Sequence, residues 1–147
     1  MKIHLATDHA GFALKEEIKK FLQENGHKVT DHGALEYNKQ DDYPDFILPA
    51  ARAVAKDPSS FGIIMGGSGQ GEAMAANRVK GVRAAVYYGE MEEIVRLSRK
   101  HNNANILTMP ARHLKWEEII LIVDTFLRTK FQNILNFYPK TFMGRNI

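Results

Sequence analysis

Length, composition and charge exclude several classes of protein. The chain has 147 residues, a usual size for one domain, and 44% hydrophobic and 25% charged residues are ordinary values for a globular protein. The absence of cysteine excludes disulfides, thiolate metal sites and a cysteine nucleophile, and the formal net charge is only +3. The basic residues are scattered, no apolar stretch matches a bilayer, and the chain begins on a strand-like run. We therefore expect no nucleic-acid partner, no membrane span, no signal peptide and a cytoplasmic location.

Strand-like and helix-like patterns alternate along the chain. In chain order we expect a strand at residues 1–7, a helix at 11–25, a strand at 27–32, a helix at 42–56, a strand at 61–65, a helix at 69–78, a strand at 83–88, a helix at 90–100, a strand at 105–109 and a helix at 114–128. Pro44 suits the first turn of its helix, whereas Pro49 should kink or restart that helix before residue 50.

This alternation predicts an α/β fold with a parallel sheet between two layers of helices. We expect residues 1–131 to form a single Rossmann-like three-layer α/β/α domain around a five-stranded parallel sheet. Residues 132–147 lose clear periodicity after Phe137, and we expect a C-terminal helical tail that docks a partner subunit. Ligands of such sheets bind at the carboxyl ends of the strands, so residues 8–11, 66–72 and 110–112 are the first candidates for a site.

A glycine-rich loop follows the apolar strand at residues 61–65 and opens the next helix. It reads Gly66-Gly67-Ser68-Gly69-Gln70-Gly71. Glycines let the backbone approach a ligand, and the free N–H groups at a helix start attract an anion or an oxyanion. The spacing fails the dinucleotide fingerprint, and Glu72 stands where a P-loop needs lysine. The loop is therefore an anion site of another type.

Glu72 has two interpretations. It can cap its helix by reaching back to the backbone of Gly69, as acidic residues in first turns often do. It can also be a general base beside an oxyanion hole, because proton abstraction next to a carbonyl needs both a carboxylate and donors for the enediolate oxygen. Ser68 and the N–H groups of the loop could be those donors. Burial would raise the pKa of Glu72 and the helix N-terminus would lower it, and the sequence leaves this open.

Two further histidine positions have both structural and functional interpretations. Asp8 and His9 end the first strand, where they either cap the next helix or bind a sugar hydroxyl and a phosphate. His101 precedes the fifth strand and therefore lies near its amino end, the wrong edge for a site in the same chain. His101 either benefits from the helix dipole or reaches the site of a neighbouring subunit. The remaining histidines lack metal-ligand spacing, so we predict no metal site.

Six motifs together resemble one family. They are Asp8-His9-Ala10-Gly11, Asp42-Tyr43-Pro44, the loop with Glu72, Ala75-Ala76-Asn77-Arg78, Gly81-Val82-Arg83 and His101-Asn102-Asn103-Ala104. In this order they resemble type B ribose-5-phosphate isomerases, whose wider family includes galactose-6-phosphate and allose-6-phosphate isomerases. The resemblance runs from Met1 to about Phe131 and is specific as a set.

The resemblance implies a sugar-phosphate aldose–ketose isomerase that interconverts D-ribose 5-phosphate and D-ribulose 5-phosphate in the pentose phosphate pathway. Some members use a cysteine before the glycine loop as the base, and others use a glutamate after it. Here Gly66 stands at the cysteine position and Glu72 at the glutamate position, so the chain resembles the second kind. It implies that Glu72 shuttles the proton between C2 and C1 through a cis-enediolate, and that His101 opens the sugar ring with help from Asp8. Residues 67–71 would hold the enediolate.

The resemblance also implies the remaining binding residues and the assembly. Asp8, His9, Asn102 and Arg112 would bind the sugar phosphate, and Tyr43 would line the pocket. No metal or organic cofactor is needed, and the sites form between subunits of a homodimer or a dimer of dimers. His101 of one chain would then lie beside Glu72 of another.

The tail departs from the family pattern. Members carry an Arg-His…Arg motif after the long helix, and the matching stretch here runs from Asn136 to Lys140. Lys140 can replace one arginine as a point charge, without the bidentate fork, and Asn136 supplies no charge. The same chemistry on a hexose 6-phosphate (allose or galactose) is therefore an alternative, and a non-catalytic sugar-phosphate-binding module is another.

Overall fold

The computed structural model describes residues 1–132 of the chain. Lys140 and all but the first residue of the tail expected at residues 132–147 lie outside the described residues. The strands are β1 (Lys2–Ala6), β2 (Lys28–Asp31), β3 (Ser60–Gly66), β4 (Ala84–Val86) and β5 (Ile106–Pro110), and the helices are α1 (Phe12–Glu24), α2 (Pro44–Lys56), α3 (Gln70–Asn77), α4 (Glu92–Lys100) and α5 (Trp116–Arg128), with a short 3-10 helix, η1 (His9–Gly11), before α1.

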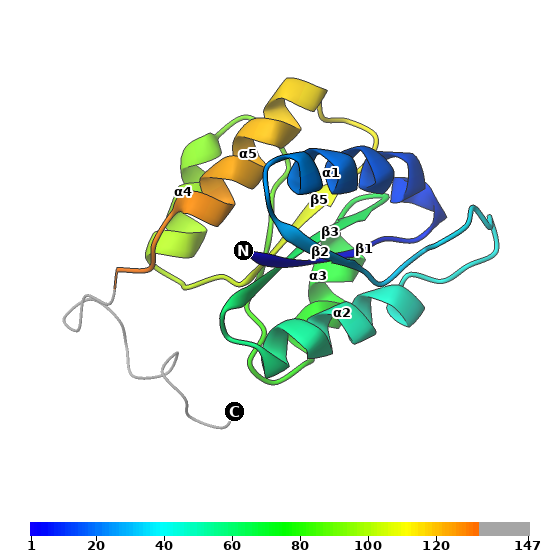
Figure 1. The fold of residues 1–147 in the computed structure, drawn as a ribbon, viewed down its shortest axis with the longest axis horizontal. Helices are drawn as coiled ribbons and strands as arrows, with labels where there is room; N and C mark the ends of the chain where they lie inside the picture. Colours follow the sequence, from blue (N-terminus) through cyan, green and yellow to red (C-terminus); the bar gives the residue numbers. More distant parts are fainter. Residues whose placement is uncertain (133–147) are drawn as a thin grey trace.

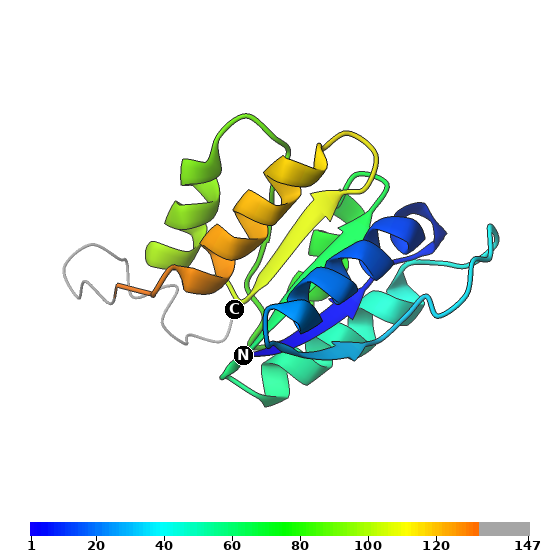
Figure 2. The ribbon, with the colours of Figure 1, turned by 45° about the horizontal axis from the view of Figure 1, so that its top comes forward.

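The five strands form one parallel sheet in the order β2-β1-β3-β5-β4. Figure 2 shows the central strands pointing the same way, so their carboxyl ends share one edge. After β1 the chain adds β2 on one side and then crosses to place β3 on the other side. The switch point of the sheet therefore lies between the ends of β1 and β3. The predicted α/β architecture with a five-stranded parallel sheet is confirmed.

Helices cover both faces of the sheet. Helices α1, α4 and α5 pack on one face, and α2 and α3 pack on the other (Figure 1). The first face carries the larger core, in which Ile18 of α1 and Phe126 of α5 are almost completely buried. On the second face Ile47 and Ala50 of α2 meet Ile64 of β3. Because the central strands are buried on both faces, they read as continuous apolar runs in the sequence.

The structure corrects one sequence expectation about the helices and refines another. Pro49 lies inside α2, which continues from Pro44 to Lys56 without a restart. Pro49 is the sixth residue of α2, so the helix lacks the one hydrogen bond that its N–H would donate and still continues. The spacing of Met91, Ile94, Val95 and Ser98 predicts one face of the helix at residues 90–100, and only part of that face is covered: Val95 is buried, whereas Ile94 and Met91, which precedes α4, are 50% and 55% exposed.

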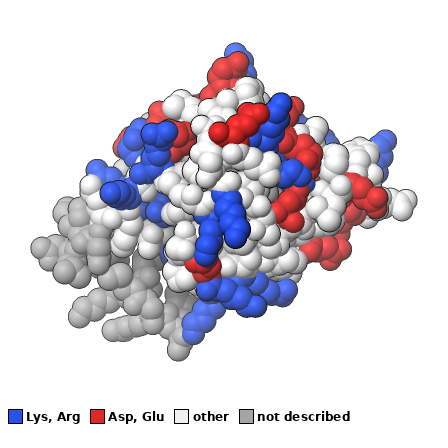
Figure 3. Space-filling model, in the orientation of Figure 1, with Lys and Arg blue, Asp and Glu red and all other residues white. Residues whose placement is uncertain are grey.

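The surface is mixed in charge. On the face drawn in Figure 3, Lys and Arg are interspersed with Asp and Glu. Within residues 1–132, no helix is both long enough and apolar enough to cross a membrane.

Candidate active site

The glycine-rich loop lies at the carboxyl end of β3, on one side of the switch point. Its geometry explains why glycine is needed. Gly69 precedes α3 with a φ of 79°, and a Cβ there would lie 3.0 Å from the backbone carbonyl carbon of Met109. The Ser68 hydroxyl accepts a hydrogen bond from the backbone N–H of Gln70 at 3.2 Å. This side-chain contact steadies a loop whose backbone packs directly against the end of β5.

Glu72 lies in the first turn of α3, and its side chain is buried, with only 4% of the residue exposed. The carboxylate fills the space beside Gly66 at the end of β3, where an added Cβ would overlap it. A residue with a side chain at position 66 is therefore incompatible with this position of the Glu72 carboxylate. Gly66 and Glu72 form one structural unit, in which the glycine makes room for the acid.

The environment of Glu72 shows whether burial or the helix N-terminus determines the direction of its pKa shift. Burial raises the pKa of Glu72 above its usual 4.5, and the nearby negative charge of Asp8 raises it further. The backbone N–H groups of Glu72 and Gly69 act in the opposite direction, but the net shift is upward. The carboxylate therefore interacts with the helix start, as a cap does, and is also a stronger base than an exposed glutamate.

Asp8 and His9 follow β1, on the other side of the switch point. Asp8 is 8% exposed, and its Oδ1 atom accepts a hydrogen bond from the N–H of Ala10 at 3.0 Å, so it caps η1. The ring Nδ1 atom of His9 lies 2.7 Å from Oδ1 of Asp41 and 3.9 Å from Oδ2 of Asp8. The sequence did not single out Asp41, whose only local signal is a pair of adjacent aspartates in a loop.

One group of side chains in residues 1–132 has the composition of a cation site. Ligand atoms of Asp8, His9 and Asp41 lie within 4.8 Å of one another. Three of the ligand atoms have protein partners, because Oδ1 of Asp41 accepts from the backbone N–H and the ring of His9, and Oδ1 of Asp8 accepts from the backbone of Ala10, whereas Oδ2 of Asp41 is buried without one. The contacts of His9 with Asp41 and of Asp8 with Ala10 hold the three side chains together without an ion.

Tyr43 and Arg112 reach the same edge from α2 and β5. The Tyr43 ring packs over the glycine loop, since a Cβ on Gly71 would lie 3.0 Å from its Cζ and Oη atoms. The N–H of Ala111 donates to the carbonyl of Gly66 at 2.8 Å and ties the end of β5 to the end of β3. Arg112 follows directly and is exposed. The structure therefore gathers Asp8, His9, Tyr43, the loop, Glu72 and Arg112 at one edge, as the strand pattern predicted.

His101 and Asn102 lie at the opposite edge. His101 ends α4, with its N–H donating to the carbonyl of Leu97 at 2.9 Å, and β5 begins only at Ile106. The five residues of β5 separate this turn from the glycine loop, a distance of roughly 16 Å along a strand. Within one chain the structure does not bring His101 or Asn102 together with Glu72, which agrees with the sequence argument about the wrong edge.

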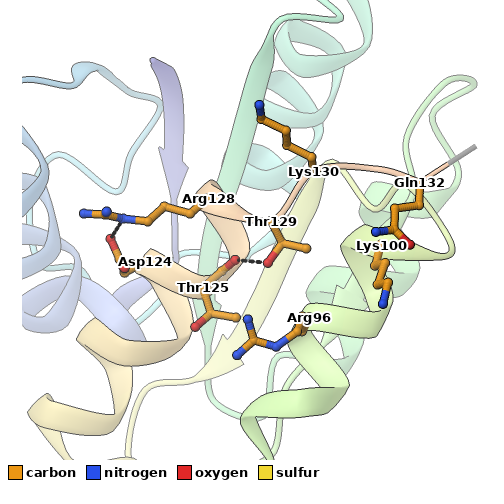
Figure 4. A pocket seen from close by; sticks show the side chains of 8 residues that line it. All are labelled: Arg96, Lys100, Asp124, Thr125, Arg128, Thr129, Lys130 and Gln132. Carbon is orange, nitrogen blue, oxygen red and sulfur yellow. Dashed lines mark hydrogen bonds and ion pairs between the residues drawn. The ribbon is translucent and has the colours of Figure 1, made fainter.

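A basic hollow lies beside the His101 turn, between the ends of α4 and α5. It has a volume of about 390 Å³, and Figure 4 shows its lining side chains. Arg96 pairs with Glu92 and Glu93, and Arg128 pairs with Asp124, so two of its cations are already neutralised. It is far from the carboxyl edge of the sheet and is not part of the candidate site.

A buried carboxylate of raised pKa in the first turn of a helix, next to a glycine-rich loop at a switch point, suits an enzyme that moves a proton next to a carbonyl. Comparison with known proteins agrees with this class. The chain matches the ribose/galactose isomerase family over residues 3–136 and belongs to that family.

Individual relatives carry a more specific name. Ribose-5-phosphate isomerase B of Mycolicibacterium paratuberculosis is 43% identical over 129 residues, which are 88% of this chain and 80% of that protein. The solved ribose 5-phosphate isomerase of Thermotoga maritima has a TM-score of 0.83 at 42% identity and covers 90% and 89% of the two chains. The enzyme of Mycoplasma genitalium with bound ribulose-5-phosphate has a TM-score of 0.83 at 40% identity, over 88% and 85% of the chains.

Proposed function

We propose that this protein interconverts ribose 5-phosphate and ribulose 5-phosphate, with Glu72 as the base. The observation that carries the proposal is the buried Glu72 carboxylate, which fills the space beside Gly66 and has a raised pKa. Relatives named for this reaction at 43% identity support the choice of substrate. A raised pKa makes Glu72 a better proton acceptor than an exposed glutamate.

The chemistry is a proton transfer between neighbouring carbons. Glu72 removes the proton from C2 of the open-chain aldose, and the C1 carbonyl oxygen takes up the negative charge of a cis-enediolate. Return of the proton to C1, with transfer of the O2 proton to O1, yields the ketose. The backbone N–H groups of residues 67–71 open α3 and favour a negative oxygen. Ser68 is exposed in the same loop and can donate to that oxygen, and Gln70 lies beside it.

We propose that the complete site forms between two copies of the chain. His101 and Asn102 lie at the edge opposite Glu72, so a second copy is needed to bring His101 to the sugar ring oxygen. The half-exposed side chains of Met91 and Ile94 on α4 support an apolar contact between copies. His101 would then protonate the ring oxygen, with Asp8 assisting, before Glu72 acts. A homodimer is the smallest assembly that satisfies this requirement.

The phosphate end of the substrate is assigned to His9 and Arg112, with Lys140 in the tail as a further cation. Both described residues follow strands at the carboxyl edge. The Tyr43 ring packs against Gly71 and would line the substrate pocket. The proposal includes a cytoplasmic location, which the absence of cysteine fits. A hexose 6-phosphate is the alternative substrate, because the tail lacks the family's arginines.

The decisive experiment compares the wild type with Glu72→Gln, which keeps the shape of the side chain and removes its basicity. We expect the wild type to isomerise ribose 5-phosphate with a higher kcat/KM than allose or galactose 6-phosphate. Glu72→Gln should still bind the substrate but lose at least about a hundredfold in kcat. Equal turnover by both proteins would exclude Glu72 as the base, and a preference for a hexose phosphate would replace the substrate.

A further inference from the structure

The loop between β2 and α2 carries a buried carboxylate that the mechanism above does not use. The side chain of Asp41 is 8% exposed. Its Oδ1 atom accepts two hydrogen bonds from His9, one from the backbone N–H at 3.0 Å and one from the ring Nδ1 atom at 2.7 Å. One oxygen thus holds both the backbone and the ring of a residue 32 positions earlier in the chain. This double contact sets the position of His9 at the end of β1.

The second oxygen of Asp41 argues against a purely structural role. Among residues 1–132, Oδ2 of Asp41 is buried and has no hydrogen-bond partner. An unpaired buried carboxylate oxygen opposes folding, because it loses water without a replacement. A buried polar group of this kind calls for an explanation, and a functional role is one that the contact with His9 suggests.

The carboxylate also determines which ring nitrogen of His9 carries a proton. An ionised carboxylate can only accept hydrogen bonds, so the proton of this contact belongs to Nδ1. The other ring nitrogen, Nε2, has no hydrogen-bond partner within the described part of the chain, and the side chain is 28% exposed. The other titratable groups that face the ring are Asp8, 3.9 Å away, and Tyr37, whose ring lies edge-on at 6.3 Å.

We propose that Asp41 is a positioning residue for the phosphate group of the substrate. It orients the His9 ring, holds a proton on Nδ1 and supplies the counter-charge for the imidazolium that forms when Nε2 accepts the proton of the phosphate monoanion and donates it back in a hydrogen bond to a phosphate oxygen. The inference rests on the proposed function, in which His9 binds the sugar phosphate. The contribution of Asp41 and His9 to phosphate binding matters more here than in a chain with the family's tail arginines. Asn136 and Lys140 stand at those positions, so fewer fixed charges are available.

A kinetic comparison tests the role of Asp41 in binding. Asp41→Ala should raise KM for ribose 5-phosphate about tenfold and change kcat by less than about threefold, because the carboxylate touches His9 and not the reacting carbons. Asp41→Asn can still accept a hydrogen bond but carries no charge, so its KM should lie between those of the wild type and Asp41→Ala. The matched control is Asp45→Asn, an exposed aspartate in the first turn of α2, with unchanged KM. A fall in kcat at constant KM would overturn the proposal.

A double-mutant cycle shows whether Asp41 acts through His9. In the background of His9→Asn, the further change Asp41→Ala should leave KM where the single His9 variant has it. An additional tenfold loss in that background would mean that Asp41 acts independently of the ring, and the proposal would be wrong. Thermal unfolding of each variant identifies losses that come from the fold.

A measurement without turnover separates this inference from the proposed function. Nitrogen NMR of His9 in the wild type should show a protonated Nδ1, and Asp41→Ala should show a mixture of tautomers. Titration with inorganic phosphate, followed at His9, should be about tenfold weaker in Asp41→Ala than in Asp45→Asn. If the wild type fails to isomerise ribose 5-phosphate but these two results hold, the proposed function fails and the Asp41–His9 phosphate site stands. Unchanged tautomer signals and phosphate affinity would overturn the inference alone.

Discussion

The two edges of the sheet differ in what a single chain can complete. At the carboxyl edge, β1, β3 and β5 end together, so Asp8, the glycine loop and Arg112 meet without help from another molecule. At the amino edge, the turn that carries His101 lies next to α5 and the basic hollow, away from Glu72. Under the proposed function, the base and the loop that stabilises the enediolate are therefore supplied by one chain, whereas the proposed acid His101 needs a second copy to reach them.

The substitution with the largest expected effect at the carboxyl edge is Gly66→Ala. Its methyl group would overlap the Glu72 carboxylate and force the base out of its position. We expect kcat to fall by at least about a hundredfold, since small displacements of a catalytic group have effects of this size. Gly67→Ala should lose far less, because a Cβ there meets no atom within 4 Å. Wild-type kcat in a folded Gly66→Ala protein would contradict the steric relation between the two residues.

Mixing two inactive variants tests the amino edge. Glu72→Gln and His101→Asn should each be inactive alone. If each site takes Glu72 from one chain and His101 from the other, a mixed dimer contains one intact site. A random mixture should therefore recover about a quarter of the wild-type activity. No recovery after subunit exchange, confirmed by mass spectrometry of the mixed dimer, would place both residues in the same chain's site.

A smaller expected effect is the pH dependence of stability that His4 and His32 cause. Measuring it distinguishes acid unfolding from titration of Glu72. Nδ1 of His4 and Nε2 of His32 lie 2.8 Å apart, and burial lowers the pKa of both rings below the usual 6.5. The unfolded chain then binds protons more readily than the folded one, so stability is complete above pH 6.5 and falls as the pH drops through the folded pKa values. His32→Gln should reduce this loss by about 1 kcal/mol or less between pH 7 and pH 5. Denaturant unfolding at several pH values measures it, and an identical slope in both proteins would exclude the pair as the cause.

Much of the carboxyl edge was predictable from neighbouring residues. Apolar runs and helical spacing indicated the succession of strands and helices along the chain. The glycines marked the loop, and the position of Glu72 directly after the loop indicated a base. Pro49 shows the limit of such rules, because α2 continues across it to Lys56. On α4, periodicity indicated an apolar face but not that Met91 and Ile94 would lie half-exposed.

The glycine loop, the helix start and the carboxylate after it were readable from the chain alone, because each depends on residues close together in sequence. Two properties needed the fold. The pKa of Glu72 rises because strand packing buries it beside Gly66 and near Asp8. Asp41 reaches His9 only because the loop after β2 returns to the end of β1, a contact across 32 residues. Local patterns encode backbone conformation, whereas burial and long-range hydrogen bonds arise only when distant segments are packed together.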